Sequence, residues 1–287
     1  MTLTLTRHRD VTAILVDQRF DVPTAPPAPH GLAWLRGAVA RFSRGADHTR
    51  RRDLATTLLP PPARLRAAAA ALAAGSEMAP PAVPVTALAA ALGARRPVHE
   101  PVATVTPGYF GRVQTGLSEM DTAVADLVAA FGGEPTERVA AAIGLLVQAH
   151  DATGGLVTRA LAALGQPPGN APTTERDGQP PHPADRIAAV LAETLRVDPP
   201  VPTMRRECLV DHDHPGLGRV AAGTVVVLDL AAANRDPDVF ADPDRFDPGR
   251  PSLDQVLTFG FGPRACPGRD HALALARGTI EGVLSRG

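Results

Sequence analysis

A chain of 287 residues with 44% hydrophobic residues can bury a full core, which excludes global disorder and leaves one large or two small globular domains. A net charge of -1 with scattered arginines gives no electrostatic case for nucleic-acid binding. Only two cysteines occur, Cys208 and Cys266, so a disulfide framework is excluded and a reducing compartment is favoured.

Helical signals dominate the first part of the chain. Residues 11–16 form a short amphipathic run before the turn-prone segment 23–30. Proline or glycine ends most of the following helices, and Pro84 stands in the first turn of one of them. Ser118 and Thr136 are the expected N-caps of two more. The predicted helices cover residues 47–59, 63–74, 85–92, 119–131 and 137–164.

The remainder of the chain changes in character. A segment rich in Pro and Gly is predicted to be a loop, over residues 167–183. Beyond it, helical, strand-like and turn-rich patterns follow one another. They are a helix over 184–197, a strand over 224–228, a turn-rich segment over 234–251 and a last helix over 271–284. The fold class is therefore predicted to be mainly α with a small β portion, and no internal repeat is present.

Membrane insertion and secretion are not expected. No apolar run reaches about 18 residues, the length of a membrane-spanning helix. Arg7, Arg9 and Asp10 interrupt any apolar stretch of the kind found in signal peptides. We therefore expect a cytoplasmic protein.

Cys266 lies in a loop whose composition suits the presentation of one thiolate to a metal. Gly260, Gly262 and Gly268 allow tight bends and a close approach to a flat partner. Arg264 offers a guanidinium group suited to a carboxylate on the bound group. A lone cysteine in a cytosolic protein is about as often a small buried hydrophobe. A single thiolate with a cation beside it favours heme.

From Phe259 to Gly268 the chain follows the pattern F-x-x-G-x-x-x-C-x-G, with Arg264 two positions before the cysteine. This pattern resembles the axial-ligand signature of the cytochrome P-450 superfamily, and similarity to its bacterial members extends over nearly the whole chain. The resemblance implies a reduced cytochrome P-450-type fold in a single domain over residues 1–287, with heme b as cofactor. It implies that Cys266 is the iron ligand, with Phe259 and Gly268 in the heme-binding loop.

Glu193 and Arg196 are three residues apart on one predicted helix face, where their side chains can form an ion pair. Taken alone, such a pair is common at surfaces and contributes little. In the resembled family this spacing is the ExxR element beneath the heme, bonded to an arginine of a following Pro-x-Arg-Phe segment. Residues 243–246 match that segment, so the resemblance implies a structural ion-pair set of Glu193, Arg196 and Arg245. The stretch 234–237 also matches.

His48 and Arg52 are four residues apart, so both project from one helix face toward a shared anion. A solvated charge run is the alternative. The resemblance implies that both residues clamp heme propionates, together with Arg206 and Arg264. These four donors suit two carboxylates.

Polar residues stand in the middle of the longest apolar helix, where burial without partners would cost free energy. The segment resembles the oxygen-activating helix of the family. Asp151 falls on its acid, but the family's adjacent alcohol is Ala152 here, and Thr153 follows. Three explanations stay open: the substrate supplies the hydroxyl, Thr153 or His150 replaces it, or the chemistry does not use oxygen activation.

The chain is short for the resembled family. It is expected to lack the usual N-terminal and C-terminal β elements and to have a shortened lid region between Leu92 and Thr136. The resemblance implies a monooxygenase that inserts oxygen into a small or carrier-bound organic substrate of secondary metabolism, with electrons from a ferredoxin and its reductase. A peroxide-using or non-monooxygenase heme enzyme and a non-catalytic heme-binding homologue are the alternatives, favoured by Ala152 and the shortened chain respectively.

Overall fold

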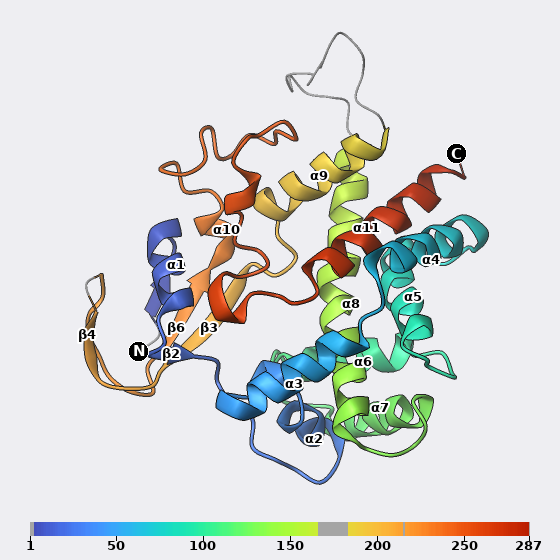
Figure 1. Cartoon of the computed structure of the whole chain (residues 1–287), viewed down its shortest axis with the longest axis horizontal. Helices are drawn as coiled ribbons and strands as arrows, with labels where there is room; N and C mark the ends of the chain where they lie inside the picture. The colour runs from blue at the N-terminus through green and yellow to red at the C-terminus, as the bar shows by residue number, and fades with distance from the viewer. Residues whose placement is uncertain (1–2, 166–182, 215, 287) are drawn as a thin grey trace. The chain divides into compact units, whose positions relative to one another are not determined.

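The structure is a computed structural model that describes residues 3–165, 183–214 and 216–286. The chain divides into two compact units. The strand unit comprises Met1–Pro23 and Thr158–Cys266, and the helical unit comprises Thr24–Val157 and Pro267–Gly287. The expectation of a single domain stays a prediction. The predicted class, mainly helical with a small β portion, is confirmed (Figure 1).

A four-stranded sheet forms the centre of the strand unit, in the order β1-β6-β3-β2. β1 (Leu3–Leu5) pairs in parallel with β6 (Val225–Asp229), and β3 (Thr203–Cys208) pairs antiparallel with β6 and with β2 (Phe20–Asp21). Alternate residues of β6 are buried, as expected for a sheet with one face on a core. A separate hairpin joins β4 (His212–His214) to β5 (Gly218–Val220).

Helices α1 (His8–Val16), α9 (Pro183–Val197) and α10 (Leu230–Ala233) complete the strand unit. The buried face of α1 packs with the sheet in one hydrophobic cluster that includes Ile14 and Leu228. The Asp229 carboxylate accepts the backbone N–H of Ala232 at 2.9 Å, and this cap fixes the point at which β6 turns into α10.

The helical unit is built from helices around a second hydrophobic cluster. Its longest helix, α8 (Glu137–Leu164), continues past Val157 into the strand unit. The Thr136 hydroxyl accepts the Val139 N–H at 3.3 Å, which confirms the predicted cap. The other helices are α2 (Gly31–Gly37), α3 (Gly45–Leu58), α4 (Pro62–Gly75), α5 (Val83–Ala91), α6 (His99–Tyr109), α7 (Leu117–Ala130) and α11 (Arg269–Leu284).

Helices α4 and α11 lie side by side at very short range (Figure 1). A Cβ atom added to Gly278 would lie 2.1 Å from the Arg66 carbonyl oxygen, and one added to Gly282 would lie 2.3 Å from that of Ala70. The Arg66 guanidinium also pairs with Glu281, at 2.6 and 2.8 Å. Glycines on α11 and alanines on α4 therefore allow backbone contact between the two helices.

Several elements differ from the sequence prediction. β1 and β2 lie in the N-terminal segment, where no strand was predicted, and α6 lies in the expected lid stretch. α6 contains Pro101 and Pro107, which masked its helical pattern, although Pro101 falls in the first turn, where no backbone donor is lost. Gly116 rather than Ser118 is the N-cap of α7. The predicted loop over 167–183 lies almost entirely outside the described residues.

Over the described ranges, none of the helices combines the length and the apolar character that crossing a membrane would require.

Candidate functional site

The Cys266 loop is a tight turn that leaves its thiol exposed. The Cys266 N–H donates to the Phe259 carbonyl oxygen at 2.8 Å, which closes the loop across seven residues. Gly260 and Gly262 adopt left-handed φ values of 73° and 69°, which few other residues tolerate. A Cβ on Gly262 would lie 2.9 Å from Val16 Cγ1, so the loop rests on the end of α1. The backbone before Cys266 is thus held in place, and the cysteine itself is exposed.

Asn234 ties this loop to α9. Its side-chain carbonyl accepts the Leu257 N–H at 2.8 Å, and its amide donates to the Thr258 hydroxyl at 2.9 Å. Thr258 in turn donates to the Leu195 carbonyl at 2.6 Å. Asn234 is fully buried and Thr258 nearly so, so these bonds are shielded from water. The stretch that matched a family motif at 234–237 therefore positions the start of the Cys266 loop.

Glu193 and Arg196 of α9 form a completely buried ion pair. Two parallel bonds join them, at 2.7 and 2.9 Å. The remaining Arg196 donors reach the carbonyl oxygens of Asn234, Pro243 and Arg245, at 3.0, 2.7 and 3.0 Å. A buried charge is tolerated only when its hydrogen bonds are satisfied, and this network meets that condition.

A second guanidinium group, that of Arg250, also pairs with the Glu193 carboxylate. Its Nε lies 3.3 Å from Glu193 Oε1, and its other nitrogens donate to the carbonyls of Ala241, Asp242 and Arg245. Arg245, expected at this place, contributes its carbonyl oxygen instead, and its side chain is exposed. Both arginines stand in one irregular segment, so the sequence offered no signal that Arg250 turns inward.

Two of the predicted cation clamps lie in the strand unit. Arg264 forms an ion pair with Asp21 of β2 at 2.6 Å. Arg206 is buried on β3, beside Val226 of β6, and donates to the Arg205 carbonyl at 3.0 Å. Asp21 could not be predicted as a partner of Arg264, because 243 residues separate the two in the chain.

The other two predicted clamps lie together on α3 in the helical unit. His48 and Arg52, both partly buried, are one turn apart, as predicted. Between them, Arg50 and Arg51 both contact Glu137 at the start of α8, Arg51 at 2.9 Å. Burial would raise the pKa of Glu137, but these two guanidinium groups lower it below its usual range. Gly268, also a predicted heme-loop residue, is the N-cap of α11.

His150 and Asp151 of α8 contact each other directly. The His150 Nδ1 donates to one Asp151 oxygen at 2.9 Å, and Arg112 pairs with the other. Burial would raise the pKa of Asp151, but the bonds from His150 and Arg112 outweigh it and lower the pKa below its usual range. Thr153 is almost completely buried, and Ala152 is half-buried.

Two residues of this cluster were missed by sequence reasoning. Arg112 follows α6, and the ring of His99, at the start of α6, has its centroid 5.5 Å from that of His150. Burial lowers the pKa of His99, and the charge of His150 lowers it further. Their sequence separations of 39 and 51 residues from the partners leave no local pattern to detect.

The residues present fit a heme better than a metal ion held by protein alone. Within the described part of the chain, no three His, Cys, Asp or Glu side chains gather into a metal site. One exposed cysteine, with an arginine two residues before it in the chain, is instead the donor set expected for iron that a porphyrin already holds. The Arg264 pair with Asp21 means that a propionate would share or replace that carboxylate.

Known proteins resemble this chain in sequence and fold. A sequence model of the family described as Cytochrome P450 matches residues 187–281. In Saccharopolyspora erythraea, the Cytochrome P450 family protein EryCII is 35% identical over 164 residues, 57% of this chain and 41% of that protein. The Erythromycin C-12 hydroxylase of the same organism is 32% identical over 143 residues, 50% of this chain and 34% of that protein.

Among solved structures, P450BioI in complex with an acyl carrier protein ligated to hexadec-9Z-enoic acid has a TM-score of 0.77 at 24% identity. The match covers 99% of this chain and 84% of that chain, and it shows the shared fold alone. Curated relatives are matched over 20% to 41% of their own lengths. The activity of a whole relative is therefore not transferred to this chain by similarity.

Proposed function

This chain is a member of the cytochrome P450 superfamily, of bacterial type, and from that membership we propose that it is a heme-thiolate monooxygenase with Cys266 as the iron ligand. The observation that carries the proposal is the exposed thiol on a loop closed by its own N–H bond and fixed to α9 through Asn234. When bound, heme b supplies oxygen activation, which thiolate ligation favours.

The cations are assigned to the heme carboxylates. Arg206, Arg264, His48 and Arg52 supply guanidinium and imidazole donors, and charge-assisted bonds of this kind are the strong ones. Phe259 would pack beside the sulfur, and Gly268 starts the helix that follows the ligand. Glu193, Arg196 and Arg250 hold the chain beneath the loop and take no part in the chemistry.

Proton delivery is assigned to α8. The low pKa of Asp151 keeps its carboxylate ionised near neutral pH, so it can hold a proton donor in place. We assign the role of proton donor to His150. Its Nδ1 donates to Asp151, which leaves Nε2 as the ring nitrogen for proton transfer. The Thr153 hydroxyl, three residues after His150 on the same helix, is the alternative proton donor.

A small or carrier-bound organic molecule is the proposed substrate, and a ferredoxin with its reductase is the proposed electron source. The complex of P450BioI with a loaded acyl carrier protein supports the carrier-bound form. The Erythromycin C-12 hydroxylase supports insertion of oxygen into a C–H bond.

The reduced carbon monoxide complex tests the ligand assignment. The purified chain should show the red-shifted Soret band of a thiolate ligand, and Cys266→Ala should abolish it. Cys208→Ala is the matched control, because Cys208 is fully buried in the strand-unit core and should leave the band in place. A wild type without the band would refute the heme-thiolate assignment.

A peroxide-using heme enzyme is the second candidate, and Ala152 favours it because the family's adjacent hydroxyl is missing. Turnover with a ferredoxin system and turnover with hydrogen peroxide separate the two. For the monooxygenase, Ala152→Thr should raise ferredoxin-driven turnover, because a positioned proton donor contributes about 100-fold or more. If wild type turns over only with peroxide, and Ala152→Thr changes neither the ferredoxin-driven nor the peroxide-driven rate, the second candidate is supported.

A further inference from the structure

The hydroxyl group of Tyr109, at the end of α6, is fully buried and has no hydrogen-bond partner among the described residues. Its ring packs edge-on against Phe42 and Phe110, with centroids 5.1 and 5.2 Å away. Burial raises the pKa of Tyr109 far above its usual value, so the hydroxyl keeps its proton and can donate it. A buried polar group without a partner costs free energy, so such a group calls for an explanation.

A second buried donor without a described partner lies in the same cluster. The Arg36 Nε is buried and unbonded, and the Arg36 guanidinium lies over the Phe42 ring, 4.8 Å from its centroid. The Arg41 guanidinium lies over the Phe110 ring at 4.8 Å. Both guanidinium charges act on the Tyr109 hydroxyl, where they oppose the effect of burial on its pKa. Two positive charges thus act on one buried hydroxyl donor.

The residue of α8 next to this hydroxyl is a glycine, Gly144, which has no side chain. A Cβ added to Gly144 would lie 3.6 Å from the Tyr109 oxygen and 3.1 Å from Val39 Cγ1. The cluster also reaches the proposed proton-delivery residues, because Arg112 stacks over Phe110 at 4.9 Å and pairs with Asp151. All of these residues belong to the helical unit.

We propose that Tyr109 and Arg36 bind an anionic oxygen group, a carboxylate or a phosphate, of a ligand whose apolar body lies against Phe42 and Phe110. Two buried donors and the adjacent cations match the acceptors of such a group, and the rings match an apolar chain. The inference deepens the proposed function and rests on it for one point only, that the ligand is the substrate.

Calorimetric titration of the full chain tests the site with three probes of equal chain length: decanoate, decyl phosphate and decanol. Wild type should bind both anions more tightly than the alcohol. Tyr109→Phe, which removes only the hydroxyl, should weaken anion binding about tenfold, as expected for a hydrogen bond to a charged group. Arg36→Gln should weaken it similarly and remove the preference over decanol.

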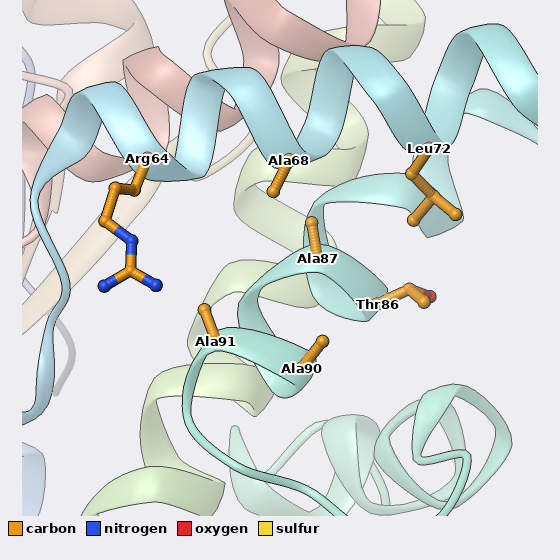
Figure 2. A pocket seen from close by; sticks show the side chains of 7 residues that line it. All are labelled: Arg64, Ala68, Leu72, Thr86, Ala87, Ala90 and Ala91. Atoms are coloured by element: carbon orange, nitrogen blue, oxygen red, sulfur yellow. The ribbon is translucent and has the colours of Figure 1, made fainter.

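Arg64→Gln is the matched control. Figure 2 shows Arg64 at one end of a hollow between α4 and α5, about 360 Å³ in volume and lined mainly by alanines such as Ala68 and Ala91. Arg64 is exposed, and Arg64→Gln removes the same charge as Arg36→Gln but at a different site. This control should leave anion binding unchanged. Binding that depends on Arg64 and not on Arg36 would place the probes in that hollow and overturn the proposal.

Thermal unfolding without probes distinguishes a ligand site from a structural one. Tyr109→Phe should keep or raise the Tm, because it removes a buried group without a partner. A lowered Tm with unchanged anion binding would mean that the hydroxyl serves the fold, through a buried water, and would overturn the proposal. Equal binding of all three probes by wild type would also overturn it. Absence of the thiolate Soret band with intact anion binding would refute the proposed function and leave this site standing.

Discussion

Glu193 shows how one buried carboxylate can organise a segment that has no regular structure. Its two oxygens accept bonds from Arg196, from Arg250 and from the Asp247 N–H. The guanidinium groups then hold the carbonyls of the turn-rich segment that leads to the Cys266 loop. Breaking such a buried pair leaves an uncompensated charge, which costs far more than the pair itself contributes.

Arg250→Ala should therefore destabilise the chain by about 3–5 kcal/mol, since it leaves Glu193 partly unpaired and removes the guanidinium bonds that Arg250 makes to three carbonyls. Arg245→Ala removes an exposed side chain and should cost about 1 kcal/mol or less. Urea unfolding of both variants measures the difference. The reverse ranking would restore the family-based expectation that Arg245 completes the ion-pair set.

The sequence predicted those parts of the site that depend on local spacing. Glu193 and Arg196 meet because one helical turn joins them, and the Cys266 loop bends where its glycines stand. Arg250, Asp21 and Arg112 could not be predicted, because each reaches its partner through tertiary folding over dozens of residues. A pattern of spacing contains no information about which of two arginines in a loop turns inward.

At the scale of the elements, α4 and α11 pack backbone against backbone. Glycine at position 278 is required because the Arg66 carbonyl occupies the place of a Cβ atom. The helical pattern predicted both helices but not their backbone contact, since glycine within a helix usually signals only lower stability. The missed helix α6 has the opposite cause, because its two prolines hid a helix that burial of Val102, Val105 and Tyr109 stabilises.

Gly278→Ala tests the contact. The added methyl group meets backbone rather than a flexible side chain, so α11 must move, and overpacking of this kind costs about 1–3 kcal/mol. Gly75→Ala, at the end of α4, is the matched control, because nothing lies within 4 Å of its added Cβ. Urea unfolding should show a loss for Gly278→Ala and no loss for Gly75→Ala. Equal stabilities would mean that the two backbones are not in contact.

For the whole molecule, the carboxyl groups with a lowered pKa predict lower stability in acid. In Asp151, Asp236 and Glu281, burial opposes ionisation, but hydrogen bonds outweigh it and lower the pKa of each carboxyl group. Unfolded carboxyl groups titrate near pH 4, so the unfolded chain binds more protons there. The stability that these groups contribute is present above about pH 4 and is lost as the pH falls through their folded pKa values.

His99 should lower the stability of the folded chain at a higher pH than the carboxyl groups do. Its pKa is lowered in the folded chain, by burial first and by the His150 charge second, whereas an unfolded histidine titrates near pH 6.5. Below about pH 6.5 the unfolded state therefore binds the extra proton, and the free energy of unfolding falls as the pH decreases. Urea unfolding from pH 7.5 to pH 5 should show this fall in wild type and a smaller one in His99→Gln. His30→Gln, which removes an exposed histidine of the same unit, should keep the wild-type slope. If His99→Gln kept the full slope, acid sensitivity in this range would arise elsewhere, and the contact between His99 and His150 would have no effect on folding.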